Sequence, residues 1–208
     1  MAYRAVGFDL LTALLDTWAL WSDVAGDRAL GMRWHGASQD RLRGRAYRSF
    51  ADIVRESALV VGVSAAKAES LLDRWGEFDP WPDVPEAIAR LAGTRTFIVT
   101  NCSIALGRRA AARAGQFDLV VTAEEAGAYK PDPRPYRRAL ETLGLDPSAT
   151  LFVAGSAHDV GGAARIGMDV YWANRGRAPA PADGVAVRVE TDLRALETVM
   201  EEHDRVRS

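Results

Sequence analysis

The chain has 208 residues, 48% of them hydrophobic, which is enough for one or two domains with a sizeable core. Its 26 Lys and Arg residues nearly balance 28 Asp and Glu residues, and the net charge of −2 argues against nucleic acid as the main partner. The single cysteine, Cys102, excludes an internal disulfide and fits a reducing compartment. Because no apolar run approaches a membrane span and the N-terminus lacks signal-peptide features, we expect a cytoplasmic protein.

Short apolar runs recur along the chain and indicate buried strands. They have the sequences AVGF, TFIVT, FDLVV, LFVAG and MDVYWA, at residues 5–8, 96–100, 117–121, 151–155 and 168–173. Helical patterns separate the later runs, at residues 104–114, 133–143 and 159–166. Strands that alternate with helices are typical of βαβ units, so the sequence predicts an α/β fold with a parallel sheet.

A helical block interrupts this alternation after the first strand. Residues 19–31, 37–62 and 64–75 have helical patterns without a good strand between them, and the stretch EFDPWPDVP, with three prolines, ends the block. We therefore predict an α/β core domain formed by residues 1–16 and 82–208, with an all-helical insert at residues 17–81. Towards the C-terminus, residues 175–184 are expected to form a surface loop and residues 190–204 a closing helix.

The first predicted strand ends in a carboxylate, Asp9, followed by mostly apolar residues in FDLLTALLD. An unpaired buried charge is costly, so this position requires an explanation. One is that Asp9 caps the next turn or helix. The other is that Asp9 belongs to a functional site, since ligands bind beyond the carboxyl ends of parallel strands.

Polar residues follow the other predicted strands as well. They are Thr100 and Asn101 after the second, Lys130 after the third, and Ser156 and Asp159 after the fourth. Taken singly, Thr100, Asn101 and Asp159 could cap helices and Lys130 could be an exposed loop lysine. Because all of them fall on one edge of one sheet, a shared functional site is the better interpretation.

Four segments in this order, FDLLTALLD, VTNCS, AYKPDP and FVAGSAHDVGGAARIG, resemble the motifs of the haloacid dehalogenase superfamily, whose hydrolases use an aspartate nucleophile. The resemblance implies a Rossmann-like parallel sheet with a helical cap inserted after the first motif. It also implies that Asp9 forms a covalent intermediate, that Thr100 and Asn101 bind the anionic group of a small-molecule substrate, and that Lys130 neutralises charge at the nucleophile.

The resemblance is greatest to the 2-haloacid dehalogenase branch. Phosphatases of the superfamily carry an acid two residues after the nucleophile, where this chain has Leu11, and usually another acid where it has Gly155. Leu11 is instead expected at the substrate site, where it keeps the surroundings of Asp9 dry. Halide leaves unprotonated and the attacked carbon is neutral, so dehalogenation needs neither a general acid nor a metal. The branch implies that Asp159 activates the hydrolytic water, that Ser156 helps to position it, and that no cofactor is required. Mg²⁺ is expected only if the chain is a phosphatase.

Three positions depart from the dehalogenase pattern. Thr12-Ala13 replaces a Gly-Thr pair, and Ala154 replaces a serine. Where the branch has a cap arginine after a tryptophan, this chain has Trp34-His35, so Arg33 or His35 is the candidate for binding the leaving group. Two other hypotheses therefore stay open: a weak Mg²⁺-dependent phosphatase, and a catalytically degenerate binding protein.

Further residues have two interpretations each. His158 could line the pocket or simply begin a helix. Trp18, Trp21 and Trp34 recur within the cap, where they could pack against the core domain or form a homodimer face. Neither nucleic acid nor a membrane is expected as a partner.

Overall fold

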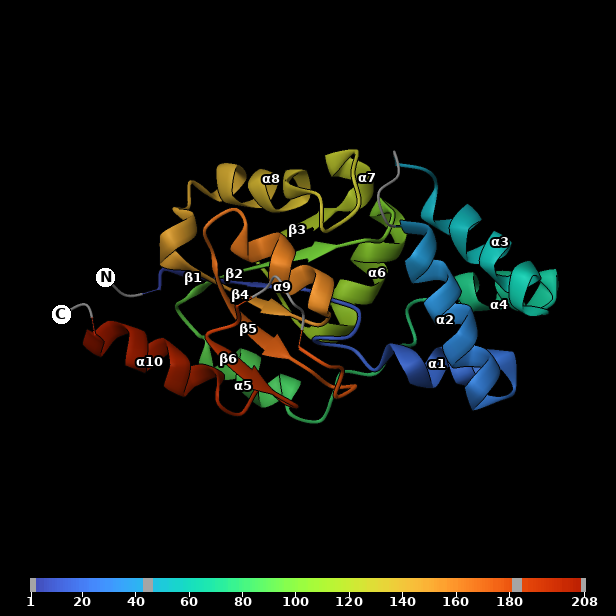
Figure 1. Cartoon of the computed structure of the whole chain (residues 1–208), viewed down its shortest axis with the longest axis horizontal. Coiled ribbons are helices and arrows are strands. Elements are labelled where there is room, and N and C mark those ends of the chain that lie inside the picture. The colour runs from blue at the N-terminus through green and yellow to red at the C-terminus, as the bar shows by residue number, and fades with distance from the viewer. Residues whose placement is uncertain (1–2, 43–46, 181–184, 207–208) are drawn as a thin grey trace.

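The computed structural model describes residues 3–42, 47–180 and 185–206. Its centre is a six-stranded parallel sheet with the strand order β3-β2-β1-β4-β5-β6 (Figure 1). The strands are β1 (Ala5–Phe8), β2 (Arg95–Thr100), β3 (Leu119–Thr122), β4 (Thr150–Ala154), β5 (Asp169–Ala173) and β6 (Arg188–Glu190). Phe8, the last residue of β1, pairs with Ile98 of β2 and Val153 of β4, so the three central strands end close to one another on the same edge of the sheet. The predicted Rossmann-like α/β fold is confirmed.

Helices cover both faces of the sheet. They are α5 (Val84–Arg90), α6 (Ile104–Ala114), α7 (Ala123–Ala126), α8 (Pro133–Leu143), α9 (Ala157–Ala164) and α10 (Leu196–Val206), with a 3₁₀ turn at Pro147–Ala149. Alternate residues of β2 face opposite ways: Phe97 packs in a cluster with Tyr136 of α8, and Ile98 packs in a cluster with Leu106 of α6. Strands buried on both faces explain why β1 to β5 are continuous apolar runs.

The helical insert lies to one side of the sheet, beyond the carboxyl ends of the strands (Figure 1). Its helices are α1 (Thr17–Ala25), α2 (Arg28–Leu42), α3 (Phe50–Val61) and α4 (Ala65–Asp73). Two connecting segments join this cap to the core, and they are tied together because Asp16 N donates to Asp79 O at 2.9 Å and Trp81 N donates to Leu14 O at 3.0 Å. The cap is therefore anchored directly above the sheet edge where Asp9 lies.

Tryptophans fill the interior of the cap rather than its outer surface. Trp21 is 4.8 Å from Trp34 and 6.1 Å from Trp75, measured between ring centroids, and all three are buried. Trp18 instead packs edge-on against Trp81 of the connecting segment at 5.7 Å. Trp21 and Trp34 therefore offer no exposed surface and Trp18 is half-buried, while a homodimer stays a prediction.

The element boundaries differ from the predictions in identifiable places. The expected helix at 19–31 is broken because Gly26 ends α1 in a left-handed conformation. The expected helix at 37–62 is also broken, since Ser49 caps a new helix, α3. Residues 43–46 of that stretch lie outside the described residues. Strand β6 and helices α5 and α7 had not been predicted: β6 has only three residues, RVE, and so no apolar run. The expected loop at 175–184 is seen through residue 180, and residues 181–184 lie outside the described part. No helix within the described residues is long and apolar enough to cross a membrane.

Candidate active site

Asp9 directly follows β1 and its carboxylate is buried at the sheet edge. The chain after it forms a turn, and α1 begins only at Thr17, where Asp16 accepts from Ala19 N as the N-cap. Asp9 therefore caps no helix, and the first of the two interpretations of this residue is wrong. Instead Thr12 Oγ1 donates to Asp9 Oδ2 at 3.0 Å. The hydroxyl displaced from the expected motif position thus still contacts the carboxylate.

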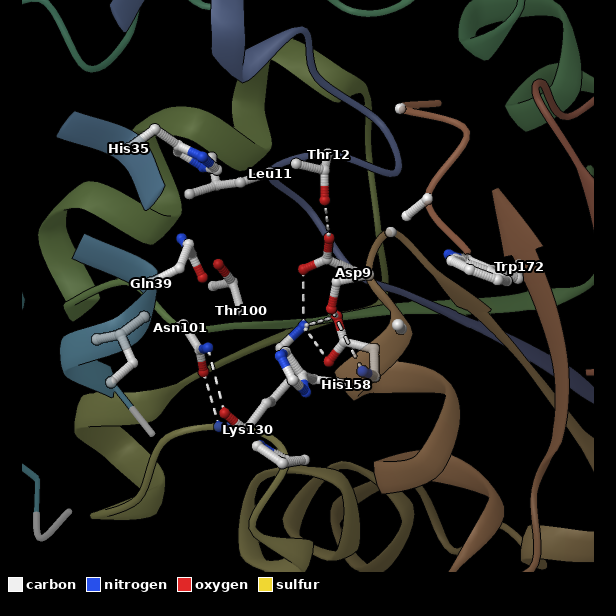
Figure 2. A pocket seen from close by; sticks show the side chains of 18 of the residues that line it. Asp9, Leu11, Thr12, His35, Gln39, Thr100, Asn101, Lys130, His158 and Trp172 are labelled. Atoms are coloured by element: carbon white, nitrogen blue, oxygen red, sulfur yellow. Dashed lines mark hydrogen bonds and ion pairs between the residues drawn. The ribbon is translucent and has the colours of Figure 1, made fainter. Parts of the chain in front are cut away.

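Lys130 lies between two buried carboxylates (Figure 2). Its Nζ is 2.7 Å from Asp9 Oδ1, and 3.1 and 3.2 Å from the two oxygens of Asp159. Burial alone lowers the pKa of the Lys130 ammonium, but the charges of Asp159 and Asp9 outweigh this and raise its pKa. Lys130 is therefore a buried cation and not an exposed loop lysine.

Asn101 holds the backbone of Lys130. Its Oδ1 accepts from Lys130 N at 2.7 Å, whereas its Nδ2 donates to Lys130 O over a long 3.5 Å. Helix α6 is preceded by Ser103 as its N-cap, so Thr100 and Asn101 do not cap it. Asn101 thus orients the lysine, and it also lines the pocket.

Asp159 is the third residue of α9, and Ser156 is the N-cap of this helix. Ser156 Oγ donates to Asp159 Oδ2 at 3.2 Å, and Tyr136 OH donates to Oδ1 at 2.8 Å. Burial raises the pKa of the Asp159 carboxyl, while the Lys130 charge opposes the change. Tyr136 had been recognised only as an apolar residue of α8. The hydroxyl of a tyrosine on the buried face of a helix needs a hydrogen-bond partner. A tyrosine at such a position is therefore the signal that could have identified Tyr136.

Gly155 gives the Asp9 carboxylate its space. A Cβ at this position would lie 2.3 Å from Thr12 Oγ1, 2.4 Å from Asp9 Oδ2 and 2.6 Å from Ala13 N. A side chain, acidic or not, therefore does not fit here without moving the turn that carries Asp9.

We expect Gly155→Ala to lower the free energy of unfolding by about 1–3 kcal/mol, as overpacked buried sites do. Urea denaturation measures this difference. Gly161→Ala in α9 is the matched control, because its Cβ would meet nothing within 4 Å. It should raise stability by about 0.5–1 kcal/mol through lower chain entropy. Equal effects of the two substitutions would contradict the steric argument.

These groups face a cavity of about 300 Å³ between the core and the cap, a size typical of small-ligand pockets. Most of the site residues predicted from the sequence line it: Asp9, Leu11, His35, Thr100, Asn101, Lys130, Ser156, His158 and Asp159. Trp172, Thr12 and Gln39 also line it and had not been predicted as site residues. Gln39 is one helical turn after His35, and both point into the cavity from α2 (Figure 2).

The cap contributes a histidine and not an arginine to this cavity. Arg33 is exposed on α2 and is not among the lining residues, so the structure does not bring it into the site. Burial lowers the pKa of His35 to about 4, against the opposing charge of Asp9, so the imidazole is neutral at pH 7. Its Nε2 is buried and has no hydrogen-bond partner within the described residues.

The carboxylates do not fit a Mg²⁺ site. Lys130 contacts both Asp9 and Asp159, Thr12 donates to the second oxygen of Asp9, and Gly155 leaves no room for another acid. Within the described part of the chain no group of three or more His, Cys, Asp or Glu side chains is arranged to hold a metal ion. Two carboxylates that both pair with Lys130, without a third acid beside them, are a poor ligand set for the Mg²⁺ expected under the phosphatase hypothesis.

Comparison with known proteins identifies the family. A family model described as haloacid dehalogenase-like hydrolase matches residues 18–167, so the chain belongs to the haloacid dehalogenase-like hydrolase family. The (S)-2-haloacid dehalogenase 1 of Pseudomonas sp. (strain CBS-3) is 36% identical over 115 residues, covering 52% of this chain and 50% of that protein. The phosphoserine phosphatase of Thermus thermophilus is 32% identical over 186 residues, covering 85% and 68%. The matches to the dehalogenases thus span about half of those relatives' length.

Solved structures show the same fold over nearly the whole chain. The L-2-haloacid dehalogenase of Xanthobacter autotrophicus superposes with a TM-score of 0.85 at 22% identity, covering 95% of this chain and 98% of that one. The same enzyme with chloropropionic acid covalently bound gives a TM-score of 0.84 at the same identity and coverage. At such identity the likeness shows the fold alone. The family match begins at residue 18 and so does not include Asp9.

Proposed function

We propose that the chain hydrolyses a 2-haloacid, or a related small 2-substituted carboxylic acid, with Asp9 as the nucleophile. The observation that carries this proposal is the ion pair of Asp9 with Lys130 in a site where Leu11 and Gly155 replace the acids that phosphoryl transfer would need. A desolvated carboxylate held by one ammonium and one hydroxyl is oriented for attack on a neutral carbon.

In the first step an oxygen of Asp9 attacks C2 of the substrate, and the C2–halogen bond breaks with its electron pair leaving on the halide. An ester joins Asp9 to C2, and the configuration at C2 is inverted. Thr100 and Asn101 bind the substrate carboxylate in this proposal. Thr100 lines the pocket and its Oγ1 is buried, which supports this role.

In the second step a water attacks the ester carbonyl of Asp9. Ser156 lines the pocket and its hydroxyl donates to Asp159, so it connects the water to that carboxylate. One proton of the water passes to Asp159, the acyl–oxygen bond breaks, and the leaving C2 alkoxide takes up the second proton of the water. The products are the 2-hydroxy acid and the Asp9 carboxylate, and Asp159 then releases its proton to solvent. Lys130 holds Asp9 in place throughout.

Halide release from L- and D-2-chloropropionate, measured with EDTA present, tests the proposal. We expect release from one enantiomer only, with no change when Mg²⁺ is added. Hydrolysis of p-nitrophenyl phosphate that depends on Mg²⁺, without halide release, would contradict it and support the phosphatase hypothesis. Absence of both activities would support the degenerate binding protein.

A further inference from the structure

Trp172 places a hydrogen-bond donor without a partner on the wall of the cavity. The residue belongs to β5, its side chain is almost fully buried, and it lines the pocket. Its Nε1–H has no acceptor among the residues that the structure describes. Figure 2 shows the nitrogen end of the indole turned towards Asp9, so the donor faces the reacting centre.

An unsatisfied buried donor is costly, since it loses its bonds to water and gains none from the protein. Two further residues with a buried polar side-chain atom, His35 and Thr100, line the same cavity. Trp172 lies on the opposite side of Asp9 from these two residues (Figure 2). With the substrate carboxylate assigned to Thr100, on the other side of Asp9, a different substrate atom is the candidate acceptor for the indole.

The part of the cavity next to Trp172 has a fixed wall. We call this part of the cavity the indole lobe. The residues that line it are Trp18, Trp172, Asn174, Gly176 and Ala178. Asn174 Nδ2 donates to Ala178 O at 2.8 Å, and Ala178 N donates to Asn174 Oδ1 at 2.8 Å, so the amide of Asn174 is used to hold the loop. A Cβ on Gly176 would lie 3.2 Å from Cη2 of Trp18, which brings the loop close against the cap.

The charge of the cavity limits what the lobe can bind. Within the described residues, Lys130 is the only lysine or arginine that lines the cavity, and it is already paired with Asp9 and Asp159. No lysine or arginine belongs to the indole lobe, and the Asp9 carboxylate is nearby. A second anionic group would be repelled there, whereas a neutral oxygen would accept from the indole without an electrostatic penalty.

We propose that the indole lobe binds the C2 substituent of the substrate and that Trp172 Nε1–H donates to a neutral oxygen on it, such as a hydroxyl or carbonyl. The preferred substrate is then a 2-substituted acid whose side chain carries an uncharged acceptor. This assignment rests on the proposed function for the identity of the substrate, and makes Trp172 a residue that determines specificity.

Two substrates of similar shape test the preference. In 2-chloro-3-hydroxypropionate the substituent is CH₂OH, and in 2-chlorobutyrate it is CH₂CH₃. We expect the wild-type protein to favour the hydroxyl compound by about tenfold in kcat/KM, the value of one buried hydrogen bond. Trp172→Phe should reduce this ratio to about one. Trp18→Phe, in the same lobe, should change both substrates by the same factor. If Trp172→Phe leaves the ratio of kcat/KM for the two substrates unchanged, the proposal is overturned.

A binding measurement separates this proposal from the proposed function. The six tryptophans give indole N–H resonances in a ¹⁵N-labelled sample, and the one missing from Trp172→Phe belongs to Trp172. We expect glycerate to move this resonance and 2-hydroxybutyrate to leave it in place. A Trp172 resonance that glycerate does not move overturns the subsite. If it moves but neither chloroacid is turned over, the subsite stands and the proposed function is wrong.

Discussion

Asp9→Asn is expected to lower halide release from 2-chloropropionate by at least about 10³-fold, because the substitution removes the attacking carboxylate. The asparagine is nearly isosteric: its Oδ1 can still accept from Lys130, and the Thr12 hydroxyl, which now donates to Asp9 Oδ2, can instead accept from the asparagine Nδ2. The fold should therefore survive. Initial rates of halide release, with urea denaturation on the same samples, separate loss of chemistry from loss of structure.

Asp83→Asn is the matched control for this substitution. The Asp83 side chain is as buried as that of Asp9, 9% exposed in each case, and it also pairs with one cation, Arg175, at 2.7 Å. Asp83 does not line the cavity. Asp83→Asn should therefore affect stability while retaining most of the activity. Comparable halide release by wild type and Asp9→Asn would show that Asp9 is not the nucleophile.

Much of the site could be predicted because the topology brings it together. Asp9, Lys130 and Asp159 are 121 and 29 residues apart along the chain, yet Lys130 Nζ contacts both carboxylates. Each follows a buried strand, and parallel strands place their carboxyl ends on one edge of the sheet. The apolar runs and their alternation with helical patterns along the chain were sufficient to predict that these side chains converge, without side-chain geometry.

The residues missed by the sequence analysis act through contacts that the sequence pattern does not reveal. Tyr136 and Trp172 lie at apolar positions of α8 and β5, where only three-dimensional structure distinguishes a polar atom that has a partner from one that has none. Thr12 reaches Asp9 because the turn after β1 folds back. Arg33, by contrast, lies two residues before His35 in the sequence but on the exposed side of α2, since residues two apart in a helix point in different directions.

The position of Lys130 explains how two carboxylates can be buried at the same edge of the sheet. Transfer of an isolated charge into a protein interior is costly, and removal of one partner of a buried ion pair leaves this cost uncompensated. Lys130 Nζ lies 2.7 Å from Asp9 Oδ1 and 3.2 Å from Asp159 Oδ2. In Lys130→Met the two carboxylates would share the site with no cation between them. Tyr136 and Ser156 still donate to Asp159, but neutral donors do not cancel its charge.

We expect Lys130→Met to lower the free energy of unfolding by about 3–5 kcal/mol at pH 7 and to abolish halide release. Burial already raises the pKa of Asp159, and loss of the opposing Lys130 charge raises that pKa further. The folded variant then binds the Asp159 proton more tightly than the unfolded chain does, so its stability rises as the pH falls through the folded pKa. The stability deficit relative to wild type should therefore shrink between pH 7 and pH 5 in urea denaturation.

Lys67→Met, which changes an exposed cap lysine that donates to Ala25 O, should show no such pH dependence. A deficit for Lys130→Met that stays constant with pH would mean that the buried carboxylates do not cause it.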